Sequence, residues 1–174
     1  MTKPVDILIA LGANLGCPEI TFFRAKLLLA SDLFNSTISS FYRTEPHFDK
    51  PDAAQPDAVV PDYVNAVMRA QTWCDPHDLM QKLLRVEEAL GRIRPAPSCS
   101  PRTIDLDLLL YGDAVIQPND DSDLEIPHPR MHLRNFVLVP AREIAPDMVH
   151  PIFKRNIGEL CVSCTDTSRI VRIS

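Results

Sequence analysis

The sequence has no apolar run close to the 18 or more residues that a membrane-spanning helix needs. Its first residues, MTKPVDILIALGANLG, contain an early Asp6 and only a short apolar run, which favours a first strand over a signal peptide. Five cysteines make an odd number, and without a secretory signal they indicate free thiols in a reducing compartment. We therefore expect a cytoplasmic protein that does not bind membranes.

The sequence also has no excess of positive charge and few aromatic residues. The formal net charge is −5, and aromatic residues make up 6% of the chain. A non-catalytic module that binds RNA on its sheet displays two or three stacking aromatics and usually a basic face. The composition therefore argues against nucleic acid as the partner and leaves small molecules as the expected ligands.

Two common nucleotide-site motifs and one metal-site pattern are missing. The chain has no GxxxxGK[ST] loop, and the glycines of LGANLG have neither Walker nor Rossmann spacing. No set of histidines and cysteines has the spacing of a tetrahedral zinc site. LGANLG is therefore interpreted as a tight turn between a strand and a helix.

The 174 residues suit one domain that buries about 70% of its unfolded surface. There is no internal repeat and no linker, so we expect a single domain over residues 1–174, acting as a monomer. Strands are predicted at 5–12, 36–44, 62–73 and 103–111, and helices from Pro18, from Asp75-Pro76 to about Leu90, over 135–145 and near 156–161. In the first helix the apolar stripe is expected at Phe22, Phe23, Leu27, Leu29 and Ala30.

The order β-α-β-β-α-β predicts an α+β, ferredoxin-like fold. Its mainly antiparallel sheet carries the helices on one face, and a C-terminal extension follows.

The strand in SPRTIDLDLLLYGD carries two carboxylates, which strands disfavour. Asp105 and Asp107 point to the same face about 7 Å apart, while Leu106, Leu108 and Leu110 are expected on the other face, in the core. Mg²⁺ prefers one or two carboxylates together with waters and substrate phosphates, so the pair predicts a magnesium site. The alternative is that both aspartates are solvated on an exposed strand face.

Arginines cluster around this strand, at Arg92, Arg94, Arg102, Arg130 and Arg134. The planar guanidinium matches phosphate oxygens bidentately, so metal carboxylates beside arginines on loops indicate phosphoryl transfer. The alternative pairs each arginine with a nearby acid such as Glu87, Glu88 or Asp113. His128, between prolines in IPHPR, could donate to a phosphate or cap a turn.

A less charged group of residues lies near the first Pro-rich loop. Thr44 ends one predicted strand, and Tyr63 and Asn65 lie in the next. An asparagine offers a donor and an acceptor in one plane, which suits the edge of a heterocycle, and Phe136 could stack on the ring. Asn65 could equally serve the backbone.

Six segments together resemble 6-hydroxymethyl-7,8-dihydropterin pyrophosphokinases. LGANLG, FYRTEP, DYVNAV, LGRIRP, SPRTIDLDLLLYGD and IPHPRMHLRNFVLVPAREIAP occur in that family's order, from about Val5 to Pro151. The resemblance implies a ferredoxin-like enzyme that transfers pyrophosphate from ATP to the hydroxymethyl group of a reduced pterin, with AMP as the leaving group, in folate biosynthesis.

The resemblance also implies roles for individual residues. Asp105 and Asp107 would hold two Mg²⁺ ions, and Arg94 and Arg102 would close over ATP as catalytic residues. ATP-binding residues would be Arg92, Arg94, Arg102, His128 and Arg134, and the pterin pocket would comprise Thr44, Tyr63, Asn65 and Phe136. The two Pro-rich loops would be lids that exclude water. Ala13, Cys99 and Ser100 depart from the family's usual residues. A metal-dependent phosphohydrolase, which needs a positioned water instead of a pterin, is the rival enzyme class.

Overall fold

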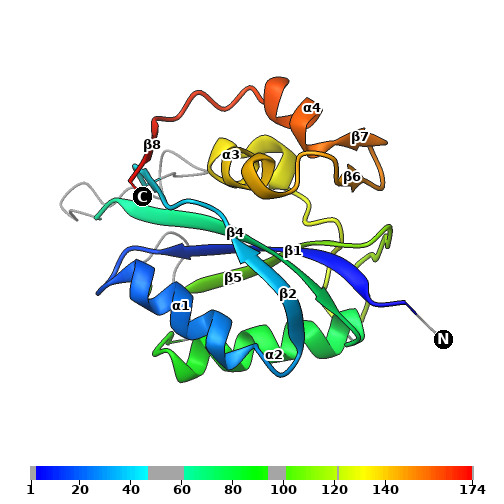
Figure 1. The fold of residues 1–174 in the computed structure, drawn as a ribbon, viewed down its shortest axis with the longest axis horizontal. Coiled ribbons are helices and arrows are strands. Elements are labelled where there is room, and N and C mark those ends of the chain that lie inside the picture. Colours follow the sequence, from blue (N-terminus) through cyan, green and yellow to red (C-terminus); the bar gives the residue numbers. More distant parts are fainter. Residues whose placement is uncertain (1–2, 47–60, 94–100, 121, 174) are drawn as a thin grey trace.

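A computed structural model describes residues 3–46, 61–93, 101–120 and 122–173. Figure 1 shows three layers: α1 and α2 cover one face of a sheet, and α3 and α4 lie over the other face. The element order β1-α1-β2-β4-α2-β5 and the antiparallel sheet confirm the predicted ferredoxin-like fold.

The main sheet has the strand order β5-β1-β4-β3-β8, and β2 also pairs with β4. Its strands are β1 (Val5–Ala13), β2 (Leu33–Ile38), β3 (Tyr42–Thr44), β4 (Tyr63–Thr72), β5 (Asp105–Tyr111) and β8 (Ile170–Arg172). All of these pairings are antiparallel. In this order the two longest strands, β1 and β4, are neighbours at the centre of the sheet.

The single strand predicted over residues 36–44 is in fact two strands. β2 ends at Ile38 and β3 begins at Tyr42. Between them, the Ser39 hydroxyl accepts a hydrogen bond from the backbone N–H of Val67 at 3.0 Å. This side chain replaces a backbone carbonyl in the ladder, so regular pairing with β4 is interrupted there.

Helices α1 (Pro18–Leu28) and α2 (Pro76–Ala89) both begin at a proline, which lacks the N–H that a first helical turn leaves unused. The side chain of Asp75 caps α2 by accepting from His77 N at 2.9 Å. The stripe predicted for α1 is only partly right. Phe22 and Leu29 are buried, but Phe23 and Leu27 face outward.

The C-terminal extension contains η2 (Met131–Leu133), α3 (Asn135–Ile144), β6 (Val149–His150), β7 (Arg155–Asn156) and α4 (Ile157–Val162). It packs on the sheet face that α1 and α2 leave free, so the sheet has a core on each side. The two cores divide the residues of β1 and β5 between them.

Leu110 was expected beside Leu106 and Leu108, but it faces the other core. Leu8 of β1 pairs with Leu110 and the next residue of β1 pairs with Leu108, so Leu109 is an extra residue in β5. Such a bulge breaks the two-residue alternation of side chains. Leu109 and Leu110 therefore both pack under α3.

Candidate active site

A cavity of about 420 Å³ lies on the face of the sheet that α3 covers, and residues of β1, β4, β5 and α3 contribute to its wall. Ten predicted site residues line it: Thr44, Tyr63, Asn65, Arg92, Arg102, Asp105, Asp107, His128, Arg134 and Phe136. The fold thus places the residues expected to bind phosphate and the residues expected to bind a heterocycle around one cavity. Arg94, Cys99, Ser100 and residues 47–60 of the first Pro-rich loop lie outside the described residues.

Two small residues of β1 form the floor of the cavity. Ala10 is the neighbour of Asp107, and Gly12 lies between Asn65 on β4 and Asp105 on β5. A Cβ atom on Gly12 would lie 3.4 Å from Asn65 Oδ1. A larger residue in this strand would fill the space between the amide and the carboxylates, so β1 keeps the cavity open.

The two carboxylates of β5 have different surroundings. Both oxygens of Asp105 are engaged, Oδ1 with Arg92 and Oδ2 with Arg102. Burial, followed by the negative charge of Asp105, raises the pKa of Asp107 to about 6. The anionic form of Asp107 is thus short of a counter-charge.

This oxygen pair fits a hard divalent cation. Among the described residues, no cluster of three or more His, Cys, Asp or Glu side chains is suited to hold a metal. Two carboxylates without further protein ligands match the way Mg²⁺ binds, because substrate phosphates and water complete its octahedral shell. A cation here would also supply the positive charge that Asp107 lacks.

Glu87 is a site residue that the sequence analysis mentioned only as a surface partner for arginine. It is 1% exposed, and its Oε1 accepts from Arg92 Nη1 at 2.6 Å and from Leu106 N at 2.7 Å. Arg92 therefore has a carboxylate on each side, Glu87 and Asp105. The sequence did contain a sign that Glu87 is buried, because it lies four residues after Leu83 and so on the core side of α2.

Asn14 joins the ends of the two Pro-rich loops. Its Oδ1 accepts from Arg102 N at 2.7 Å, and its Nδ2 donates to Pro61 O at 3.2 Å. The guanidinium of Arg102 lies 5.8 Å from the ring centroid of Tyr63, so this residue connects the carboxylates to the other end of the cavity. Sequence reasoning interpreted the segment around Asn14 only as a turn, because no local pattern shows which distant backbone a side chain meets.

His128 both caps a turn and faces the cavity. Its ring Nδ1 accepts from Arg130 N at 3.2 Å, which places the proton of the neutral ring on Nε2. Burial, then the positive charges of Arg134 and Arg130, lowers its pKa to about 4. A neutral ring with Nε2–H is a hydrogen-bond donor suited to a phosphate oxygen.

The other end of the cavity is built from an amide, a hydroxyl and two aromatic rings. Asn65 Nδ2 donates to Thr44 Oγ1 at 2.8 Å, so the amide serves a side chain and not the backbone. Its Oδ1 lies on the cavity side, beside Gly12. The guanidinium of Arg134 lies 5.5 Å from the ring centroid of Phe136 on α3. Polar groups with fixed directions next to a ring suit a flat heterocycle.

A ferredoxin-like sheet with paired carboxylates and arginines at one end of a cavity, and a heterocycle pocket at the other, defines a phosphoryl-transfer enzyme class. The chain belongs to the 7,8-dihydro-6-hydroxymethylpterin-pyrophosphokinase (HPPK) family, whose model matches residues 8–146. This match spans most of the chain and includes every residue of the candidate site.

Individual relatives agree with this membership. The chain is 42% identical over 146 residues to a 2-amino-4-hydroxy-6-hydroxymethyldihydropteridine pyrophosphokinase of Haemophilus influenzae, covering 82% of this chain and 83% of the relative. It is 38% identical over 162 residues to a protein of the same name from Synechocystis, covering 90% and 76%.

Solved structures share the fold at low identity. A Plasmodium falciparum HPPK-DHPS structure with pteroate aligns with a TM-score of 0.67 and 16% identity, covering 92% of this chain. The chain spans 42% of the length of that solved protein. The likeness supports the ferredoxin-like architecture described above.

Proposed function

We propose that this chain transfers pyrophosphate from ATP to the hydroxymethyl oxygen of 6-hydroxymethyl-7,8-dihydropterin in a magnesium-dependent reaction. The pyrophosphokinase activity in folate biosynthesis and the use of ATP are those of its family. The observation that carries the proposal is the single cavity in which Asp105 and Asp107 share the space with Asn65 and Phe136. A phosphate-binding end and a heterocycle-binding end in one cavity are what a transfer between two bound substrates requires.

In this proposal Asp105 and Asp107 would hold two Mg²⁺ ions, which would supply positive charge against the triphosphate. Both oxygens of Asp105 are engaged, one by Arg92 and one by Arg102, so this carboxylate is held in place in the cavity wall. The two guanidinium groups lie beside it, and a guanidinium binds phosphate oxygens bidentately.

The remaining phosphate contacts come from His128, Arg134 and Arg94. The Nε2–H of His128 donates to a phosphate oxygen at neutral pH, because its lowered pKa keeps the ring uncharged. Arg134 lines the same cavity. Arg94 keeps the role of a catalytic loop arginine that the family resemblance implies, since it lies outside the described residues.

The pterin pocket comprises Thr44, Tyr63, Asn65 and Phe136. Asn65 Oδ1 accepts from an N–H of the ring edge, since Nδ2 is held by Thr44. Phe136 stacks on the face of the ring. The hydroxymethyl oxygen then attacks the β-phosphorus, the bond from that phosphorus to the oxygen of the α-phosphate breaks, and AMP leaves.

We further propose a single catalytic domain over residues 1–174, in the cytoplasm, with no nucleic-acid or membrane partner. Across the described residues, no helix has the length and apolar character to span a bilayer. The acidic net charge of −5 supports a small-molecule enzyme.

The decisive assay incubates the purified protein with Mg-ATP, with and without 6-hydroxymethyl-7,8-dihydropterin, and separates the products. We expect AMP and the pterin diphosphate in equal amounts, formed only when the pterin is present. Release of ADP and phosphate without pterin would identify the rival phosphohydrolase and contradict the proposal.

A further inference from the structure

Helix α3 joins the heterocycle end of the cavity to a polar contact with strand β3. Phe136, in the first turn of α3, lines the cavity. Glu143 follows seven residues later, in the last turn. This spacing is close to two full helical turns, so both side chains project from the same side of the helix. One side of α3 therefore carries a wall of the pocket at one end and a carboxylate at the other.

Strand β3 has a matching arrangement. The carboxylate of Glu143 accepts from Ser40 N at 3.1 Å, from Ser40 Oγ at 2.8 Å and from Tyr42 Oη at 2.9 Å, just before and at the start of β3. Thr44 follows two residues after Tyr42, so both side chains lie on the face of the sheet that α3 covers. Thr44 Oγ1 accepts from Asn65 Nδ2 at 2.8 Å in the wall of the cavity. Strand β3 therefore also joins the Glu143 contact to the pocket.

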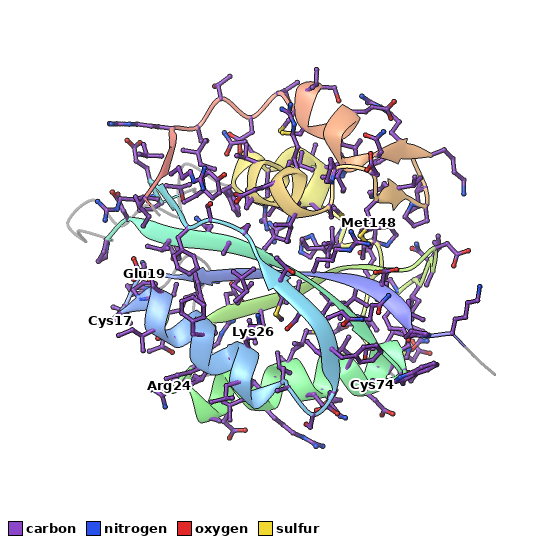
Figure 2. The ribbon with its side chains drawn as sticks, viewed as in Figure 1. Cys17, Glu19, Arg24, Lys26, Cys74 and Met148 are labelled. Carbon is purple, nitrogen blue, oxygen red and sulfur yellow. The ribbon has the colours of Figure 1, made fainter. Side chains whose placement is uncertain are left out.

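The apolar packing between α3 and the sheet is less specific about position than these hydrogen bonds. Leu138 and Ala141 pack into this layer, and Met148 reaches it from beyond the end of the helix (Figure 2). Hydrophobic contacts are non-directional, whereas hydrogen bonds require defined distances and angles. The donors gathered around the carboxylate of Glu143 therefore specify where α3 lies relative to β3.

We propose that Glu143 is a positioning residue for the pterin, an inference that rests on the proposed function. By holding β3 against α3, its carboxylate sets the separation between the ring of Phe136 and the amide of Asn65. Glu143 is not among the described residues that line the cavity, so it acts through these two side chains and does not touch a substrate. The paired carboxylates of the phosphate-binding end lie on β5, which β1 and β4 separate from β3. The effect of Glu143 should therefore fall on the pterin and spare ATP.

Steady-state kinetics of the full chain with both substrates test the proposal. Glu143→Ala should raise the KM for the pterin about tenfold and Tyr42→Phe about threefold, because the stacking ring and the amide are no longer held at the right separation. The KM for ATP should stay within about twofold in both variants, because the triphosphate is positioned at the other end of the cavity. Arg142→Ala is the matched control, since Arg142 is the exposed neighbour of Glu143 on α3, and it should change neither constant. Equal rises in the two KM values would overturn the proposal.

A conservative variant and a binding measurement separate positioning from other effects. Glu143→Gln keeps the side-chain length and an acceptor oxygen, so it should recover most of the pterin affinity that Glu143→Ala loses. A purely structural role would reduce the amount of folded enzyme, which lowers the apparent kcat and leaves both KM values unchanged, and that result would also overturn the proposal.

Fluorescence titration of the pterin, with Mg²⁺ and a non-hydrolysable ATP analogue present, measures affinity without turnover. A wild-type chain that binds the pterin but transfers no pyrophosphate would contradict the proposed function alone. Unchanged pterin affinity in Glu143→Ala, in a chain that does transfer pyrophosphate, would contradict the role of Glu143 alone.

Discussion

At the scale of single residues, Asp107 shows how a site can cost stability. Its carboxylate lies in the cavity wall beside Asp105, and burial and that negative charge raise its pKa to about 6. A buried charge without a full counter-charge destabilises the fold. Removing it should therefore favour folding while it removes one of the two proposed metal ligands.

We expect Asp107→Ala to lower the transfer rate by a factor of about a hundred or more, since charge stabilisation of the phosphates is lost. The midpoint of thermal unfolding should stay the same or rise. Isothermal titration should show weaker ATP binding in the presence of Mg²⁺ and little change without it. Full activity in this variant would contradict the magnesium assignment.

Arg102 contacts both ends of the cavity, because its guanidinium pairs with Asp105 and lies over the ring of Tyr63. If its main partner during reaction is the triphosphate, Arg102→Ala should lower kcat by about 10³-fold or more. The dissociation constant for the pterin alone should change much less. Single-turnover kinetics together with fluorescence titration of the pterin separate the two effects, and equal losses would exclude a triphosphate contact.

At the scale of elements, one buried carboxylate adds polar contacts to the apolar packing of α2 on β5. Glu87 accepts from the backbone of Leu106 and from the side chain of Arg92. The first bond fixes the strand that carries both aspartates, and the second fixes an arginine beside Asp105. A single side chain thus links the helix to the geometry of the site.

Glu87→Ala should destabilise the fold by about 3 kcal/mol, because it removes one of the two carboxylates that hold Arg92 and leaves Leu106 N without an acceptor. Urea unfolding measures this loss. Glu88→Ala is the matched control, since Glu88 is exposed on the same helix turn and should change stability little. Equal effects of the two substitutions would show that the buried carboxylate has no special role.

At the scale of the whole molecule, the C-terminal extension is held to the sheet through Glu143 of α3. Its carboxylate accepts from Ser40 N at 3.1 Å, from Ser40 Oγ at 2.8 Å and from Tyr42 Oη at 2.9 Å. Burial alone would raise the pKa of Glu143, but these hydrogen bonds outweigh it and hold the pKa below its usual value of 4.5. The extension is thereby fixed at the junction of β2 and β3.

A lowered pKa in the folded state means that this stabilisation is complete above pH 4.5 and is lost as the pH falls through the folded-state pKa. We expect Glu143→Gln to be less stable than the wild type near neutral pH, with the difference shrinking at acidic pH. Chemical unfolding at a series of pH values measures it. A difference that stays constant down to acid would show that the carboxylate charge contributes nothing.

The sequence by itself determined the βαββαβ order of the core, the fold class and most of the candidate site residues. Local patterns suffice for these. Strand alternation places Asp105 and Asp107 on one face, and a proline in the first turn marks where a helix begins. Ten of the eleven predicted site residues line one cavity, and Arg94 stays a prediction.

The tertiary structure alone decided which distant groups meet. The break at Ser39 and the bulge at Leu109 arise from pairing with neighbouring strands. The outward position of Phe23 arises from how α1 sits on the sheet, and Asn14 reaches loop ends that are far away in sequence. Sequence periodicity indicates which side of a helix or strand faces the core. Hydrogen bonds and packing between segments depend on where the other segments lie, which periodicity does not contain.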